Sequence, residues 1–228
     1  MTGRRELFLE EMGLGPVWRL RPAAAPAQAS EGAHGEGLGW SELKSRVAAC
    51  TACELHRTRT RTVFGVGDEN ADWLLVGEAP GADEDAQGEP FVGQAGKLLD
   101  NMLQSIGLKR GENVYIANVL KCRPPGNRNP LPEEVAKCEP YLRRQVELIR
   151  PKLIVSLGKF AAQTLLGQDA TIASLRGSVH AYQGIPLIVT YHPAYLLRTL
   201  PDKAKAWEDL CLAKQTMQDL CSKNSATI

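Results

Sequence analysis

Four cysteines have a spacing that indicates a metal site. Cys50 and Cys53 form a C-x2-C pair, and two single cysteines, Cys122 and Cys138, follow further along the chain. Thiolates in such a set bind zinc or an iron–sulfur cluster, and spacing alone does not separate the two. Structural zinc sites usually combine two short knuckles, so one knuckle with two scattered cysteines favours a cluster. The alternative is that all four are ordinary buried core residues.

Three polar residues that could take part in acid–base or hydrogen-bonding chemistry stand just after apolar runs. Glu78 follows the run at 73–76, Asn118 the run at 114–117, and His192 the run at 187–190. An amide donates and accepts at once, which suits the edge of a nucleobase, although it can equally tie down a loop. A lone histidine is more often structural, but this one falls at the same predicted sheet edge as the other two.

A glycine-rich segment follows the first apolar run and precedes an amphipathic stretch. It contains Ala79, Gly81, Glu84 and Phe91. A loop of this kind between a strand and a helix lets backbone N–H groups approach a ligand closely. It is not a Walker loop, because its Gly-Lys pair is followed by leucine, and no complete dinucleotide fingerprint is present. Nucleoside triphosphate chemistry is therefore not expected.

The elements that must position these residues can be predicted from four short apolar runs. The runs at 73–76, 114–117, 153–156 and 187–190 alternate with helical stretches. This pattern predicts a three-layer α/β/α fold with a central four-stranded parallel sheet. Ligands bind such sheets at the carboxyl ends of the strands. A helix over 41–49, capped by Ser41, is expected to lead into Cys50.

Composition sets the domain organisation. The chain has 228 residues, 43% of them hydrophobic and 23% charged, which suits one globular domain with a tail. Residues 1–39 are predicted to be an N-terminal extension, with a short helix at 5–12 and a Pro-, Ala- and Gly-rich linker, and residues 40–228 the globular domain. The net charge is only +1, so affinity for a polyanion must come from local patches.

The sequence also bears on location. No apolar run is long enough to span a membrane, and the N-terminus lacks the apolar core of a secretory signal. We therefore expect a cytoplasmic, intracellular protein of bacterial type that is monomeric, has no membrane partner and keeps its thiols reduced.

Several segments together closely resemble the family 4 uracil-DNA glycosylases. The matching stretches are GEAPGADEDAQGEPFVGQAGKLL, NVLKCRPPGNRNP and YHPAYLLR, with the four cysteines in the family's order, over about residues 40–220. The resemblance implies an enzyme that flips uracil out of DNA and hydrolyses its N-glycosidic bond in base excision repair. It also implies a four-iron four-sulfur cluster on the four cysteines, and uracil-containing DNA, double or single stranded, as the partner.

The resemblance further implies roles around the base. Phe91 would stack on the uracil ring, and Asn118 would read O4 and N3–H. Glu84 would lie near C5, where its bulk could exclude the thymine methyl. Cytosine would present a donor where uracil has an acceptor, and the mismatch would leave buried groups unpaired. His192 would donate a hydrogen bond to O2 as the base becomes anionic.

One position departs from the pattern of the better-known uracil glycosylases. Their analogous loop carries an aspartate for the attacking water, and the matching position here is Ala79. Glu78 beside it is the nearest substitute, so we expect it to orient water or the sugar cation; its alternative role is to fix the loop. The backbone at Ala79 and Gly81 is expected to lie against the substrate.

DNA contacts are expected from the segment after His192. Tyr195, Leu196 and Leu197 could wedge into the gap left by the flipped base, while Arg198 reaches a phosphate. The alternative is an ordinary helix start that packs its leucines inward. Three arginines follow the cysteine pair at alternate positions, Arg57, Arg59 and Arg61. In an extended segment they would share one face, which would either contact phosphates or be a solvated run of charge.

Two other functions remain open at this point. A related uracil-binding protein that traps the base covalently would need a nucleophilic histidine in an insertion near Asn118, and residues 123–137 contain none. A non-catalytic iron–sulfur nucleic-acid binding module would bind uracil-containing DNA without releasing uracil.

Overall fold

A computed structural model describes residues 37–225 of the chain. The predicted helix at 5–12 and most of the predicted linker fall outside the described residues. Within residues 37–225, no helix has the length and apolar character needed to cross a membrane.

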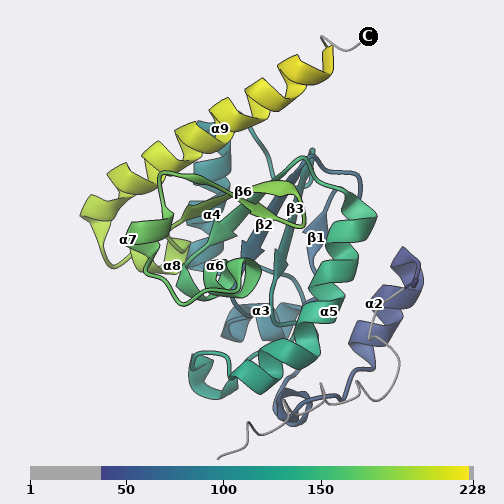
Figure 1. Ribbon diagram of the computed structural model, residues 1–228. Coiled ribbons are helices and arrows are strands. Elements are labelled where there is room, and N and C mark those ends of the chain that lie inside the picture. The colour runs from purple at the N-terminus through teal and green to yellow at the C-terminus, as the bar shows by residue number, and fades with distance from the viewer. Residues whose placement is uncertain (1–36, 226–228) are drawn as a thin grey trace, which may run out of the picture. The chain divides into compact units, whose positions relative to one another are not determined.

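The centre of the fold is a six-stranded sheet with the order β1-β3-β2-β4-β6-β5 (Figure 1). The strands β3, β2, β4 and β6 pair with one another in parallel, and the edge strands β1 and β5 pair antiparallel. In chain order the strands are β1 Val66–Gly67, β2 Trp73–Gly77, β3 Val114–Asn118, β4 Leu153–Leu157, β5 Val179–Tyr182 and β6 Ile185–Thr190.

The mixed α/β class is confirmed, but the prediction missed two strands, since the sheet has six: the four predicted strands at its parallel centre and an antiparallel strand at each edge. The four apolar runs lie within β2, β3, β4 and β6. The two extra strands gave no such run because β1 has only two residues and β5 is largely exposed. An edge strand that is not covered on both faces does not need a continuous apolar sequence.

Both faces of the sheet are covered by helices. Successive residues of a strand point to opposite faces, so Trp73 and Leu75 pack on one side of β2 while Leu74 and Val76 pack on the other. The first side is covered by α4, α8 and α9, and the second by α5, α6 and α7. Figure 1 shows the long α9 and α5 on different sides of the sheet.

The helices follow the amphipathic stretches of the sequence. In α4, for example, Leu99, Met102 and Leu103 are buried at the spacing of one helical face. The helices and 3-10 turns are α2 Trp40–Ala48, η1 Glu54–Arg57, α3 Ala82–Gln87, α4 Gln94–Ser105, η2 Pro125–Asn127, α5 Pro132–Ile149, α6 Lys159–Leu166, α7 Ile172–Leu175, α8 Pro193–Leu196, η3 Leu200–Asp202 and α9 Lys203–Ser225.

Helix α2 begins two residues earlier than a Ser41 cap predicts. Its N-cap is Gly39 and not Ser41, and the side chain of Glu42 accepts a hydrogen bond from the Gly39 N–H at 3.2 Å. An acidic residue that reaches back to the N-cap satisfies a donor that the helix itself leaves free. Cys50 follows directly after the end of this helix, as expected.

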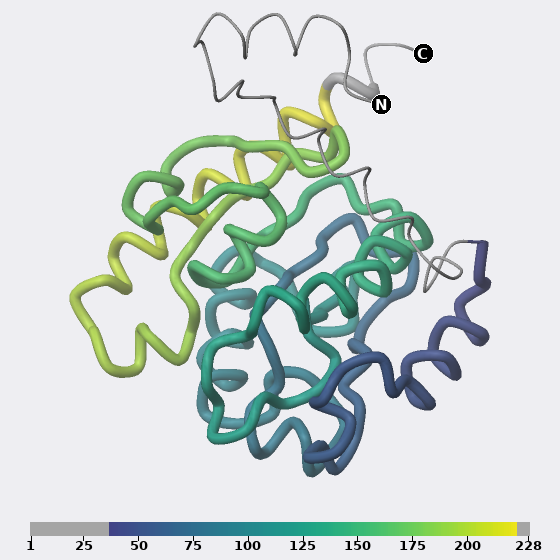
Figure 2. The backbone as a smooth tube through the Cα atoms, turned by 60° about the horizontal axis from the view of Figure 1, so that its bottom comes forward, coloured from purple at the N-terminus to yellow at the C-terminus, as the bar shows by residue number. Residues whose placement is uncertain are grey.

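The parallel strands end level with one another. Gly77, the last residue of β2, pairs with Asn118, the last residue of β3, and Leu157 of β4 pairs with Thr190 of β6. The segments that follow these strands therefore start at one edge of the sheet. Figure 2 brings this lower edge of Figure 1 forward.

Candidate active site

A cavity of about 450 Å³ lies at the carboxyl edge of the sheet. It is bordered by the segments that follow β2, β3 and β6. It gathers every predicted catalytic and substrate-binding residue and two of the three predicted DNA-binding residues: Glu78, Ala79, Gly81, Glu84, Phe91, Asn118, His192, Tyr195 and Arg198.

Asn118 presents a buried acceptor that lacks a partner. Its side chain is 2% exposed, and its Oδ1 has no hydrogen-bond donor within residues 37–225. Gly77 makes this placement possible, because a Cβ at that position would lie 2.3 Å from Asn118 Oδ1 and 2.7 Å from the ring of Phe91. A buried acceptor without a partner costs about 1–3 kcal/mol. The arrangement therefore favours a ligand that brings a donor into the cavity.

His192 is held as a neutral imidazole. Burial lowers the pKa of His192 to about 4; the positive charge of Arg198 adds to this effect, and the negative charge of Glu84 opposes it. Its Nδ1 accepts a hydrogen bond from the Ala194 N–H at 3.1 Å. In a neutral ring the proton must then lie on Nε2. His192 is thus a neutral hydrogen-bond donor at the cavity.

Gly158 and Phe91 surround the histidine. A Cβ at Gly158, whose φ is +96°, would lie 2.9 Å from His192 Cβ, so the chain needs glycine at this close approach. The rings of Phe91 and His192 stack with centroids 5.5 Å apart and an interplanar angle of 29°. An aromatic face and a neutral donor therefore lie together in the cavity.

The backbone of Phe91 adopts an unfavourable conformation, which hydrogen bonds from Arg110 hold in place. Its φ is +56°, which is uncommon for a bulky residue. Arg110 donates to the carbonyl oxygens of Pro90 and Phe91, each at 3.0 Å. A strained conformation persists only when its surroundings fix it. Arg110 therefore supports the aromatic wall of the cavity, although no sequence motif singled it out.

Glu84 fixes the other side of the same loop. Its carboxylate accepts hydrogen bonds from the N–H groups of Gly81 at 3.1 Å, Val92 at 3.0 Å and Gly93 at 3.3 Å. The side chain lines the cavity, but its oxygens are bound to the backbone. Its bulk, more than its charge, is what it offers to a ligand.

Glu78 is a carboxyl group with an altered acidity. Burial raises its pKa to about 7. Within the part of the chain that the structure describes, no hydrogen bond or ion pair is recorded for its side chain. A carboxyl group that is half ionised near neutral pH can accept a proton from water or face a developing cation.

The segment 123–131 supplies cavity residues that sequence reasoning missed. Arg128 lines the cavity and donates to both carboxylate oxygens of Glu134, at 2.6 and 2.9 Å. Glu134 is 2% exposed, so this bidentate pair holds the guanidinium in place. The stretch NVLKCRPPGNRNP contained these residues, but no spacing within it marked Arg128.

The prediction for Leu196 is wrong. Leu196 is 1% exposed and belongs to the core beneath α4 and α9, so it cannot enter DNA. The next residue, Leu197, is 41% exposed. Leu197 is the C-cap of α8 and points about 100° away from Leu196 around the helix axis, off the face that packs on the core. Tyr195 stacks on Tyr191 with centroids 5.2 Å apart.

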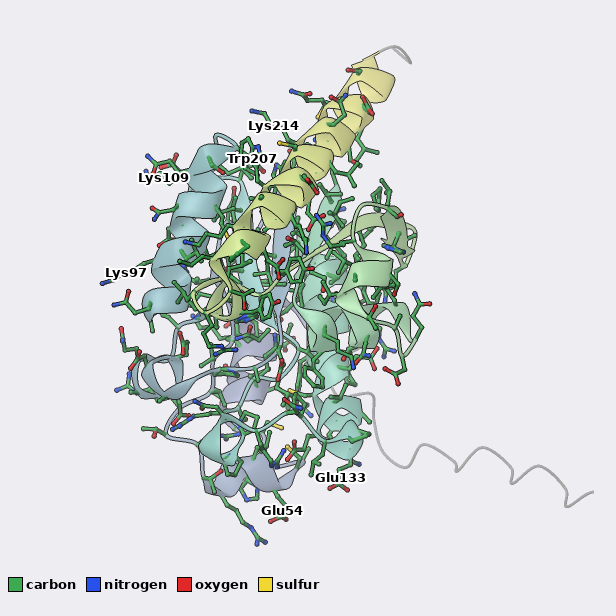
Figure 3. All side chains as sticks on the ribbon, turned by 90° about the vertical axis from the view of Figure 1, so that its left-hand side faces the viewer. Glu54, Lys97, Lys109, Glu133, Trp207 and Lys214 are labelled. Atoms are coloured by element: carbon green, nitrogen blue, oxygen red, sulfur yellow. The ribbon has the colours of Figure 1, made fainter. Side chains whose placement is uncertain are left out.

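The four spaced cysteines lie together at the same end of the molecule. Cys50, Cys53, Cys122 and Cys138 line one small pocket, beside His56, Arg59 and Lys121. Figure 3 shows Glu54, which follows Cys53, and Glu133, in the first turn of α5, at this end. Burial raises the pKa of the Cys53 and Cys122 thiols, and that of Cys138 to about 12.

The donor set of this pocket fits a metal–thiolate group. Buried thiols ionise readily only beside cations or a metal. Arg59 Nη1 donates to Cys122 Sγ at 3.1 Å, and the Lys121 N–H donates to Cys138 Sγ at 3.2 Å. No three Cys, His or carboxylate side chains among residues 37–225 meet the geometry for a single metal ion. Cys211 and Cys221 are exposed on α9, apart from this pocket.

The arginine row does not form the expected common face. The segment is not extended, because residues Glu54–Arg57 form η1. Arg57 pairs with Glu54 at 3.1 Å, Arg59 turns to Cys122, and Arg61 donates to the carbonyl of Gln87 at 3.5 Å. Arg59 therefore belongs to the cysteine pocket and not to a phosphate-binding row.

Comparison with known proteins identifies the family. Residues 64–211 match the family model described as the uracil DNA glycosylase superfamily, and the chain belongs to this superfamily. A type-4 uracil-DNA glycosylase from Archaeoglobus fulgidus is 47% identical over 195 residues, which cover 82% of this chain and 96% of the relative. One from Thermotoga maritima is 44% identical over 176 residues, covering 75% and 91%. The resemblance to the family 4 enzymes is therefore confirmed.

A more distant group also matches. A type-5 uracil-DNA glycosylase from Thermus thermophilus is 32% identical over 155 residues, which cover 58% of this chain and 68% of the relative. The lower identity and coverage agree with the assignment to type 4.

Proposed function

We propose that this protein is a uracil-DNA glycosylase, which flips uracil out of DNA and hydrolyses its N-glycosidic bond in base excision repair. Its family and the names of its relatives support this reaction. The observation that carries the proposal is one cavity lined by both Asn118, with its unpaired Oδ1, and His192, with its Nε2–H.

Asn118 reads the base. Uracil presents an N3–H donor beside the O4 acceptor. Oδ1 of Asn118 accepts from N3–H, which satisfies the unpaired buried oxygen, while the amide N–H donates to O4. Cytosine has an amino group in place of O4 and no proton on N3. Both contacts would then fail and leave buried groups unpaired, which discriminates strongly between the bases.

Phe91 and Glu84 shape the rest of the pocket. Phe91 stacks on the uracil ring, a contact available to a base only after it leaves the duplex. Glu84 excludes thymine by bulk, since its three backbone hydrogen bonds prevent it from moving away from a methyl group. The backbone at Ala79 and Gly81 lies close to the bound base.

His192 stabilises the departing base. Breaking the N-glycosidic bond leaves negative charge on uracil and positive charge on the sugar, as in glycoside hydrolysis. The Nε2–H of neutral His192 donates to O2 as that oxygen gains charge. A fixed donor aimed at a developing charge needs no reorganisation during the reaction.

Glu78 acts on the sugar side. In its ionised form it orients the attacking water and faces the oxocarbenium-like sugar. Water adds its oxygen to C1′ and gives its proton to the carboxylate, and the departing uracil leaves with the bonding electron pair. Glu78 thus takes the place of the aspartate that the better-known enzymes carry at the position of Ala79.

DNA contacts come from the rim of the cavity. Arg198 and Arg128 line the cavity and supply positive charge for phosphates on either side of the flipped nucleotide. Leu197, which is exposed just after α8, fills the gap in the duplex in place of the buried Leu196. Tyr195, which precedes Leu197 and Arg198 in the sequence, also borders the cavity.

The cysteine pocket holds a four-iron four-sulfur cluster through Cys50, Cys53, Cys122 and Cys138. When bound, the cluster supplies a cross-link and no redox step in base excision. It ties the end of α2 to the segment after β3 and to α5. Residues 123–131, which include Arg128, run between two of these ligands and border the cavity.

An oligonucleotide carrying one deoxyuridine tests the proposal against its alternatives. A glycosylase yields an abasic site that alkali cleaves. A covalent uracil-trapping protein instead yields a slowly migrating adduct on a denaturing gel. A non-catalytic binding module shifts the DNA in a native gel but leaves it resistant to alkali. Either of the last two results would refute the proposed reaction.

A further inference from the structure

Lys121 is a buried lysine between the cysteine pocket and the cavity. Its side chain is 1% exposed. Its Nζ donates to the main-chain carbonyl of Asn118 at 2.7 Å and to Oε1 of Gln145 at 2.6 Å. Both acceptors are uncharged oxygens. The ammonium thus fixes the residue that reads the base in the proposed function, but gains no opposite charge from these partners.

The surroundings of Lys121 are themselves rigid. Gln145 is fully buried, and its Nε2 donates to the carbonyl of Phe64 at 2.9 Å, which orients Oε1 towards the lysine. No ion pair between Lys121 and a carboxylate is recorded among residues 37–225. A buried ammonium is strongly unfavourable unless an anion lies nearby. The anion must therefore come from another group.

The cysteine pocket provides that anion when its thiols are ionised around a metal group. Lys121 lines this pocket, and its backbone N–H donates to Cys138 Sγ at 3.2 Å. Arg59 donates to Cys122 Sγ. Four thiolates around an iron–sulfur cluster carry a net negative charge. The guanidinium of Arg59 contacts a ligand sulfur directly, whereas Lys121 contacts one through its main chain and carries its ammonium on the same residue. Two cations gathered at one cysteine site suit a negative centre.

We propose that Lys121 couples the cysteine site to uracil recognition. Its ammonium balances the charge of the metal–thiolate centre and at the same time holds the main chain of Asn118. Lys121 is therefore a positioning residue, which acts on the base through Asn118. This inference rests on the proposed function, because it assigns Asn118 to the base.

Two variants test Lys121, and the second also removes the polar partner that the first leaves buried. Lys121→Met removes the ammonium. A double variant, Lys121→Met with Gln145→Leu, also removes the amide that the single change would leave buried and unpaired. The matched control is Lys137→Met, which removes an exposed lysine at the rim of the same pocket. Circular dichroism and melting temperature report whether each variant folds.

Iron retention is the first measurement. Each purified protein is incubated with EDTA, and the loss of cluster absorbance is followed with time. We expect loss about tenfold faster in both Lys121 variants, the lower end of the effect of changing partners around metal ligands. Lys137→Met should match the wild type within about twofold. Wild-type retention in the folded double variant, or wild-type protein purified without iron, would overturn the proposal.

Free uracil supplies the second measurement. Coupling between two sites is reciprocal, so a ligand beside Asn118 should change the stability of the cysteine site. Saturating uracil should slow iron loss in the wild type and in Lys137→Met, but not in the Lys121 variants. Equal protection of all four proteins would refute the coupling. If the wild type shows this pattern yet releases no uracil from DNA, the proposed reaction fails while the coupling stands.

Discussion

Replacing His192 with leucine tests how the departing uracil is stabilised. The pKa of His192 is about 4, so at pH 7 only about one ring in a thousand carries a second proton. The effective donor must then be the neutral Nε2–H that the Ala194 hydrogen bond selects. Removing one such donor typically slows the chemical step about 10²- to 10³-fold, or about 3–4 kcal/mol. His192→Gln retains a neutral N–H donor and should recover part of this loss.

The assay is single-turnover excision with enzyme in excess over a deoxyuridine oligonucleotide, followed by alkaline cleavage, from pH 5.5 to 9. An unchanged rate in His192→Leu would refute the assigned role. A wild-type rate that falls tenfold for each pH unit above neutrality would also contradict it, because that profile requires a positively charged donor.

The same variant changes the acid stability of the fold. The pKa of His192 is lower in the folded state than its ordinary value of 6.5. Its contribution to stability is therefore complete above pH 6.5 and is lost as the pH falls towards 4, with a limit of roughly 3 kcal/mol. Urea unfolding at pH 7 and pH 4.5 should show a smaller loss in His192→Leu than in the wild type. Equal losses would show that the ring is not buried as a neutral group.

Three further substitutions test other parts of the site. Burial raises the Glu78 pKa to about 7, so Glu78→Gln should abolish the fall in the wild-type excision rate below pH 7, and a variant that keeps this fall would contradict the assigned role. Ionisation of Glu78 costs stability as the pH rises from 4.5 to 7, so the variant should gain more in melting temperature at pH 8 than at pH 5. Arg110→Met releases the strained backbone of Phe91 and should raise KM about tenfold, with a smaller change in kcat. The control is Lys109→Met, which alters the exposed neighbouring residue and should leave both constants unaltered. A wild-type KM in Arg110→Met would show that Arg110 does not support the pocket. Cys122→Ala should lower iron content, soluble yield and melting temperature together, and a stable, fully active, iron-free variant would refute a structural role for the cluster.

Much of the sheet and of the cavity could be predicted from the sequence. Strands buried on both faces need continuous apolar runs, so β2, β3, β4 and β6 were readable from local composition. Because parallel strands end at one edge, Glu78, Asn118 and His192 could be expected in one place from their positions alone. The motif segments then supplied the family.

The errors and omissions have a common cause. Leu196 and Leu197 are adjacent and chemically alike, and only the packing of α8 against the core decides which of them is buried. Arg59, Arg110 and Lys121 act through contacts with residues far away in the sequence. No local pattern reports such contacts, so the sequence places Arg59 on a phosphate-binding or solvated face and singles out neither Arg110 nor Lys121.

The central claim is that the cavity hydrolyses the bond between uracil and deoxyribose. The most direct test is to incubate the protein with a deoxyuridine oligonucleotide in water enriched in oxygen-18 and to weigh both products by mass spectrometry. We predict free, unlabelled uracil and one oxygen-18 atom in the abasic sugar. Recovery of intact oligonucleotide, or of uracil attached to the protein, would contradict the claim.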